Sequence, residues 1–263
     1  MSLLFKDKSN FNGDISSWDT SYVINMQKMF QSATSFIGTS TLSSDVLSYW
    51  DTSSVNDMSY MFSFAASFTG QLSSWDTSNV SATGQMFRSA HSFNGNIGAW
   101  DVSKVTDMYY MFQDAKKFND DLSTWTTSSV INMEGMFYDA TAYDHVAADI
   151  MWNTSNVRNM KDMFRNAESF GTNGGGTFGI FWNTQNVITV NVRFVYHCCF
   201  KRLQKISHKK HLKLILNIGS TDTPRPTFCY VFHWFLILPL RLVCSCIRYY
   251  LRQSHSFYRI IIF

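Results

Sequence analysis

The first 187 residues of this 263-residue chain contain no cysteine, no proline and only two histidines, His91 and His145. Without cysteine, this segment has no disulfide framework and no Cys-His nucleophile, and two histidines suggest no repeated Ser-His-Asp geometry. The glycine run Gly174–Gly176 lacks the Lys-Ser/Thr pair of a phosphate-binding loop. We therefore predict that the protein is not an enzyme and that His91 is a solvated surface residue.

Positive charge is also scarce in this segment, where 10 Lys plus Arg stand against 18 Asp plus Glu, a net charge of −8. Residues 188–263 carry 12 against 1, a net of +11, and hold all five cysteines and all three prolines. The whole-chain charge of +3 therefore averages two unlike parts. We predict a repeat domain over residues 1–187 and a basic tail over 188–263. We expect no nucleic-acid binding by the repeat domain, because its charge would repel phosphate.

Tryptophan marks a repeat with a period of 25 residues, set by Trp50, Trp75, Trp100 and Trp125. Each tryptophan is followed 11 and 12 residues later by a Met-Phe pair. Self-similarity at such a period is typical of a solenoid, whose units bury their apolar sides against one another. We count seven units, the last degenerate, and predict a continuous core of Trp, Met, Phe and Ala columns. Its aromatic columns are Trp18, Trp50, Trp75, Trp100, Trp125 and Trp152, with Phe30, Phe62, Phe87, Phe112, Phe137 and Phe164.

Two periods alternate inside one copy of the repeat, residues 93–118. Apolar residues at steps of three, three, one, three and three predict an amphipathic helix of about four turns: Val105, Met108, Met111, Phe112, Ala115 and Phe118. Upstream, Ile97-x-x-Trp100-x-Val102 has the spacing of a short strand. We therefore predict an α/β repeat fold of turn-strand-helix coils, with parallel short strands on one face and helices on the other.

The repeat has a recognisable pattern, M-F-x-x-A-x-x-F-N-x-D/N-I/L-S-x-W-D-T-S-x-V-x-x-M. This pattern resembles the tandem repeats of BspA-type leucine-rich repeat surface proteins, over residues 1 to about 187. Ile97-x-x-Trp100-x-Val102 resembles the L-x-x-L-x-L strand signature of leucine-rich repeats. The resemblance implies a right-handed, horseshoe-like solenoid, located at the cell surface or outside the cell, which acts in adhesion or protein binding. It brings no catalytic residues.

The repeat is interrupted at Ile37–Asp45 and at Gly171–Gly179, where we expect inserted loops. At the start of the chain, Leu4-Phe5 aligns with Met111-Phe112, so Met1 stands in the middle of a unit. A solenoid ordinarily begins with a polar cap. We therefore expect a longer parent protein with further repeats, a leader segment, or both.

The tail contains an apolar run, Thr227–Ile247, about as long as a membrane-spanning helix. His233, Pro239 and Arg241 inside this run are costly in hydrocarbon. Its cysteines lack zinc-ligand spacing. Three interpretations stay open: non-native sequence translated past an exon boundary near Val187, a membrane anchor, or a cap or separate small domain. With an anchor, the repeats would form the ectodomain of a receptor or sensor.

An acidic residue directly follows four of the tryptophans: Asp19, Asp51, Asp76 and Asp101. Two interpretations of this column are open. Each carboxylate accepts hydrogen bonds from nearby backbone or Ser/Thr groups, or the column holds a divalent cation or a basic partner. The sequence predicts no other cofactor.

The sequence also contains two N-glycosylation acceptor sites, Asn79-Val80-Ser81 and Asn153-Thr154-Ser155, which matter only in a eukaryotic secretory route. Taken together, these features predict a non-catalytic surface or secreted repeat protein for protein binding or adhesion. Its partner would be a protein or surface ligand that contacts an acidic, hydroxyl-rich face.

Overall fold

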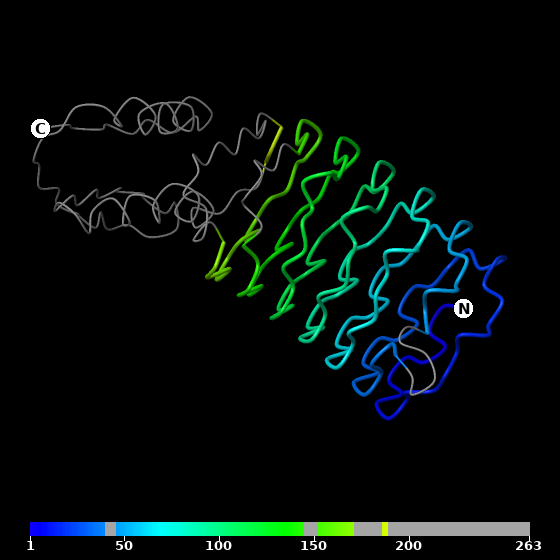
Figure 1. Ribbon diagram of the computed structural model, residues 1–263. Coiled ribbons are helices and arrows are strands. Elements are labelled where there is room, and N and C mark those ends of the chain that lie inside the picture. Colours follow the sequence, from blue (N-terminus) through cyan, green and yellow to red (C-terminus); the bar gives the residue numbers. More distant parts are fainter. Residues whose placement is uncertain (40–45, 145–151, 171–185, 189–263) are drawn as a thin grey trace, which may run out of the picture. The chain divides into compact units, whose positions relative to one another are not determined.

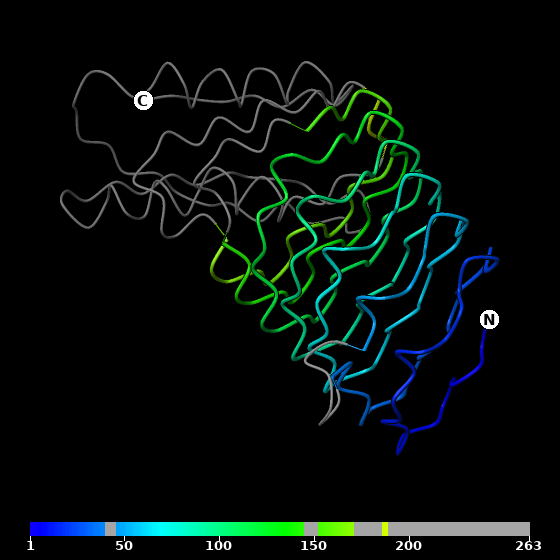
Figure 2. The same cartoon turned by 45° about the vertical axis from the view of Figure 1, so that its right-hand side comes forward.

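The computed structural model describes residues 1–39, 46–144, 152–170 and 186–188. These residues belong to the first of two units, Met1–Cys198 and Cys199–Phe263. They wind into successive coils, one per repeat, that stack in the order of the sequence (Figure 1). Seen from another side, each coil again follows the path of its neighbour (Figure 2). Isolated parallel bridges join neighbouring coils: Asn25–Asp57, Asp57–Ala82, Ala82–Asp107, Asp107–Asn132 and Asn132–Asn159.

The predicted α/β fold is wrong, because the described residues form no α-helix and no extended strand. The expected helix is a run of turns that also bonds to the next coil. The amide of Ala33 donates to the carbonyl of Phe30 (3.0 Å), which closes a turn. The amide of Phe30 donates instead to Met61 of the next coil (2.9 Å), and that of Ser32 donates to Ser63 (2.8 Å). An α-helix would bond each amide four residues back within one segment.

Residues with positive φ recur four positions apart in each coil, as Lys28 and Ser32 do (both 59°). Ser32 is the third residue of the turn from Phe30 to Ala33, which is the position that requires positive φ in a type II turn. The position of Ser32 in successive coils is occupied by Asp7, Ser32, Phe64, Ser89, Asp114, Asp139 and Asn166. All of these except Phe64 are small polar residues, which tolerate positive φ.

The apolar stripe that suggested a helix is buried, although its backbone is not helical. Val105, Met108, Met111, Phe112, Ala115 and Phe118 are all at most 1% exposed. The first and last residues of a β-turn lie close together, so linked turns place apolar side chains on one side at steps of three. Met108 and Met111 are the ends of one such turn, in which the amide of Met111 donates to the carbonyl of Met108 (3.2 Å). A step of three in the sequence therefore fits both structures.

The expected strand is also replaced by turns. Trp100 N–H donates to the carbonyl of Ile97 (3.1 Å), and Val105 N–H donates to that of Val102 (3.0 Å). The parallel pairing between coils occurs further along, at Asp107. The leucine-rich-repeat arrangement of a strand face opposite a helix face is therefore absent from the described residues.

Stacked aromatic rings fill the centre of the coils. Within one coil, Phe112 lies against Phe118 with ring centroids 3.9 Å apart. Between coils, Phe87 and Phe112 are 5.7 Å apart, and Phe93 and Phe118 are 5.8 Å apart. Such offset stacks bury large apolar areas. The structure places Trp18 at the partly buried edge of this core, and it buries Trp50, Trp75, Trp100, Trp125, Trp152, Phe30, Phe62, Phe87, Phe112, Phe137 and Phe164.

The first insertion does not disturb the stacking. Trp18 and Trp50 are 32 positions apart, yet their rings are 6.4 Å apart, like those of Trp50 and Trp75. Val46 N–H donates to the Gly38 carbonyl (3.1 Å) and so closes the inserted loop at its base.

Most of that loop (residues 40–45), the glycine-rich insertion and the tail with Thr227–Ile247 lie outside the described residues. In the described ranges, no helix is long and apolar enough to cross a membrane.

Candidate functional site

The four aspartates that follow tryptophan lie on the surface of the stack, one per coil. Asp19 Oδ1 accepts hydrogen bonds from the amide (3.0 Å) and the hydroxyl (2.7 Å) of Ser21. Asp51 makes the same two bonds with Ser53 (2.9 and 2.6 Å). Asp76 and Asp101 accept from the amides of Ser78 and Ser103, both at 2.9 Å. We call these four aspartates and their serines the Asp-Ser strip.

Hydrogen bonding lowers the pKa of the carboxyl groups of this strip. The serine hydroxyl is the largest cause that lowers the pKa of Asp19 and Asp51, and the serine amide adds to it. The hydroxyl and amide of Ser78 lower the pKa of Asp76, and those of Ser103 lower the pKa of Asp101. Neighbouring aspartates act against this shift, as Asp19 does on Asp51, but do not reverse it. The strip is therefore negatively charged at neutral pH.

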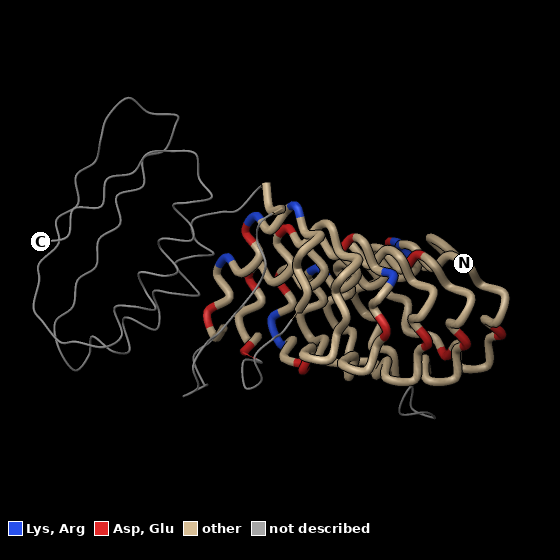
Figure 3. Tube along the Cα trace, turned by 90° about the horizontal axis from the view of Figure 1, so that it is seen from above, with Lys and Arg blue, Asp and Glu red and all other residues tan. Residues whose placement is uncertain are grey.

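The strip is built into the stack through the threonine that follows Asp19, Asp51 and Asp76, whereas Asp101 is followed by Val102. Thr52 Oγ1 donates to the backbone carbonyl of Asp76 in the next coil (2.9 Å), and Thr77 Oγ1 donates to that of Asp101 (3.0 Å). Both threonines are buried. This ladder fixes the offset between successive aspartates, and acidic positions recur from coil to coil (Figure 3).

Each aspartate thus has a local serine partner, which is the first of the two interpretations of this column. In the part of the chain that the structure describes, no three His, Cys, Asp or Glu side chains gather closely enough to hold a metal ion. The column continues as Thr126 and Asn153, and Asn153 Oδ1 accepts the amide of Ser155 in the same way (3.1 Å). An asparagine therefore keeps the turn and removes the charge.

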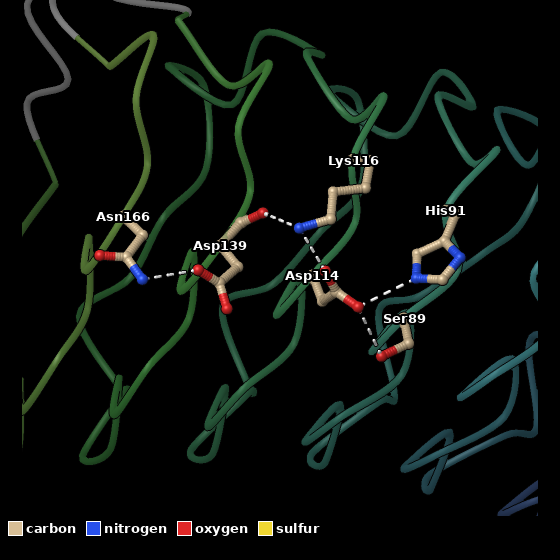
Figure 4. A network of polar contacts seen from close by, with 6 residues as sticks. All are labelled: Ser89, His91, Asp114, Lys116, Asp139 and Asn166. Carbon is tan, nitrogen blue, oxygen red and sulfur yellow. Dashed lines mark hydrogen bonds and ion pairs between the residues drawn. The ribbon is translucent and has the colours of Figure 1, made fainter.

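A second polar network centres on Asp114 (Figure 4). Its Oδ2 is 2.9 Å from His91 Nε2 and accepts from Ser89 Oγ (3.2 Å), and its Oδ1 is 2.5 Å from Lys116 Nζ. Lys116 also donates to the carbonyl of Asp139 in the next coil (3.3 Å). In a catalytic triad the histidine lies between serine and aspartate. Here His91 and Ser89 both contact the same carboxylate oxygen, so this geometry does not match a triad.

Asp114 remains ionised in this network. Partial burial alone would raise the pKa of its carboxyl, but hydrogen bonds from Lys116 and His91, together with their charges, outweigh it and lower the pKa. His91 is exposed, as the sequence suggested, but it is paired with Asp114 rather than only with solvent.

A third cluster consists of tyrosines. Tyr60 and Tyr110 each precede a Met-Phe pair, but tyrosine does not recur at this position in the other coils, so no periodic signal marks the cluster in the sequence. Tyr109 lies over Gly84 of the preceding coil, and Tyr110 lies over Gly135 of the following one. A side chain at either glycine would collide with the ring. The hydroxyl of Tyr109 is hydrogen-bonded to that of Tyr60. Burial, followed by the hydrogen bond to Tyr60, raises the pKa of Tyr109.

Tyr110 points the other way along the stack. Its hydroxyl donates to Glu134 Oε1 (2.9 Å), which also lies 3.8 Å from Lys161 Nζ. Burial and the bond to Glu134 raise the pKa of Tyr110 to about 12. Both Tyr109 and Tyr110 therefore carry neutral hydroxyl groups at physiological pH.

The two glycosylation acceptor residues are exposed. Asn79 Nδ2 donates to the carbonyl of Ser53 (2.8 Å), and its Oδ1 accepts from Lys104 Nζ (2.7 Å). Asn153 belongs to the column that continues the Asp-Ser strip. Both acceptor nitrogens are thus on the surface, although that of Asn79 already bonds to a neighbouring coil.

A family model described as "Mycoplasma protein of unknown function, DUF285" matches the chain in three overlapping stretches, residues 1–45, 36–152 and 144–211. Together these stretches cover residues 1–211 of 263. The chain belongs to this family. As a member of DUF285 it is a repeat protein, and the last stretch runs beyond Val187. No curated protein and no solved structure matches it. The family description names neither leucine-rich repeats nor a ligand.

Proposed function

We propose that this DUF285 protein is a non-catalytic binding protein of the cell surface or extracellular space, and that it holds a protein or surface ligand through the Asp-Ser strip. The observation that carries the proposal is the repeated geometry of Asp19, Asp51, Asp76 and Asp101. Each is exposed, ionised and held by a serine two residues later. Membership of a repeat family and the resemblance to BspA-type surface proteins support the same role.

The geometry suits binding because little side-chain freedom is left to lose. The Asp51 carboxylate is already fixed by two hydrogen bonds from Ser53. A partner with complementary charge would therefore meet an ordered row of carboxylates, and ordering costs at an interface are small when groups are preorganised. Charge on the strip would also speed the encounter with a basic partner at low salt.

The test is adhesion of beads coated with the full chain to immobilised extracellular-matrix proteins and to cultured cells. The variant Asp51→Asn/Asp76→Asn keeps the turn acceptors, as Asn153 does naturally. The control Asp7→Asn/Asp139→Asn makes the same charge change in a different column. We expect retention of wild-type beads, about 3- to 10-fold weaker retention with the strip variant, and wild-type retention with the control.

Two results would overturn the proposal. Wild-type beads retained no better than uncoated beads would exclude adhesion to the surfaces tested, and equal losses in both double variants would exclude the strip as the contact. Surface labelling of native cells with a membrane-impermeant reagent tests the location separately, because a protein of the surface or exterior is labelled and an internal protein is not.

A further inference from the structure

Tyr60 and Tyr109 belong to coils with one coil between them, and their hydroxyl groups form a hydrogen bond. They meet because the coil between them carries Gly84, over which the ring of Tyr109 lies. The ring centroids are 6.2 Å apart and the ring planes are inclined at 78°. Gln85 Nε2 donates to the Tyr60 hydroxyl (3.2 Å). Both rings are half-buried, so part of each remains open to solvent.

We propose that Tyr60 and Tyr109 form an oxidative modification site, where peroxide and a one-electron oxidant of the haem peroxidase class join them by a dityrosine bond. In an ortho-coupled dityrosine, each hydroxyl stands next to the carbon of the new bond, so the two hydroxyls lie side by side. The hydroxyl contact of Tyr60 and Tyr109 already has this relation, and the steep angle between the rings matches a twisted biaryl. Coupling therefore requires the rings to approach each other without turning over.

The chemistry balances with peroxide as the final oxidant. Each tyrosine gives one electron and its phenolic proton, and together these reduce one peroxide to two waters. The two phenoxyl radicals couple through one Cε carbon of each ring. Each coupled carbon then loses its hydrogen as a proton, and each phenolic oxygen gains a proton, which restores both aromatic rings. The protein gains one C–C bond and loses two hydrogen atoms.

Three other tyrosines, Tyr110, Tyr22 and Tyr49, are less suited to coupling within the molecule. Tyr110 lies edge-on to Tyr109 (6.0 Å, 73°), but its hydroxyl is bonded to Glu134. Tyr22 and Tyr49 are 91% and 74% exposed, which favours coupling between molecules. These differences make Tyr60 and Tyr109 the expected intramolecular pair.

The bond would close a loop of 49 residues and tie three successive coils together. A cross-link of this kind restricts the unfolded chain and slows the separation of the coils. Oxidation would therefore stabilise the stack, and we expect its melting temperature to rise by about 5–15 °C.

The experiment treats the dilute full chain with a haem peroxidase and limiting hydrogen peroxide, and isolates the monomer by gel filtration. We expect the monomer to gain dityrosine fluorescence and to lose the mass of two hydrogen atoms. Peptide mapping should find a fragment with residue 60 joined to a fragment with residue 109. Tyr60→Phe and Tyr109→Phe should each abolish the signal in the monomer, whereas Tyr110→Phe and Tyr22→Phe should keep it.

Peptide mapping of the wild-type chain supplies an answer even if a variant folds poorly, and circular dichroism melting checks the fold of each variant. Three results would overturn the proposal: dityrosine only in dimers, a monomer cross-link that persists in Tyr60→Phe, or one that maps to another pair.

Discussion

The indole N–H of Trp100 donates a hydrogen bond to the carbonyl of Leu72 in the preceding coil (3.0 Å), and both residues are buried. The bond recurs along the stack between Trp75 and Leu47 (3.0 Å). Each tryptophan thus fills the core and also satisfies a buried carbonyl of its neighbour. Since a buried carbonyl without a partner is costly, the tryptophan column joins the coils by both packing and hydrogen bonding.

Replacing Trp100 with alanine should lower the free energy of unfolding by about 3–5 kcal/mol, because it leaves a cavity and an unpaired carbonyl. Trp100→Phe should cost less, since it keeps a ring. Lys117→Ala, at an exposed position, should stay within about 0.5 kcal/mol. Urea unfolding of the three variants is the measurement, and equal effects at Trp100 and Lys117 would contradict the packing described here.

Asp107→Asn should stabilise the protein at neutral pH. Burial is the largest influence on Asp107 and raises the pKa of its carboxyl, so the folded state holds this proton more tightly than the unfolded state. Its contribution to stability is therefore present at acid pH and is lost as pH rises through the folded-state pKa. Asparagine keeps the acceptor for the Tyr109 amide (3.1 Å) and carries no charge.

Asn132 and Asn159 occupy the same column, so the substitution is compatible with the coil. The expected gain is below about 1 kcal/mol at pH 7 and vanishes toward pH 3. Denaturant unfolding at both pH values measures it, and a gain that grows toward acid pH would reverse the sign argued here.

Ala82 interrupts a column in which the other bridging residues accept an amide two positions later, as Asp57 does from Ser59 (2.8 Å). Ala82→Asn should restore this acceptor and raise the free energy of unfolding by about 0.5–1 kcal/mol. The control, Ala99→Asn, lies at an exposed position outside the column and should change little. Thermal unfolding compares the two, and no difference between them would count against the proposed role of the column.

Tyr143 stands in a column of phenylalanines, and its hydroxyl is buried without a hydrogen-bond partner in the described residues. Tyr143→Phe should leave stability unchanged or raise it by up to about 1 kcal/mol, because it removes an unpaired polar group. The reverse change in the same column, Phe118→Tyr, should destabilise by about 1–3 kcal/mol. Destabilisation by Tyr143→Phe would point to a partner for this hydroxyl.

The sequence predicted which side chains are buried in the core better than it predicted the secondary structure of the backbone. Met111 and Phe112 could be assigned to an apolar column because periodicity reports which side chains share one side. The backbone could not be assigned, because helices and linked turns both give steps of three. The deciding bonds, such as that from Phe30 to Met61, join residues 31 positions apart. Phe118, which belongs to a second aromatic column, was assigned to the same helix because it lies three residues after Ala115.

The same distinction applies to the candidate sites. The bond between Asp19 and Ser21 could be anticipated because the partners are two residues apart. The contact of Tyr60 and Tyr109 could not, since it joins residues 49 positions apart and depends on Gly84 between them. Tyrosine does not recur from coil to coil at either position, so no sequence signal marked the pair.

The bonding partner of the Phe30 amide tests the account most directly. Through-hydrogen-bond couplings between amide nitrogen and carbonyl carbon, measured by NMR on isotope-labelled protein, identify that partner. We predict a coupling from Phe30 N to the carbonyl carbon of Met61, and one from Ala33 N to that of Phe30. A coupling from Phe30 N to Met26, four residues back, would instead indicate an α-helix and contradict the fold described here.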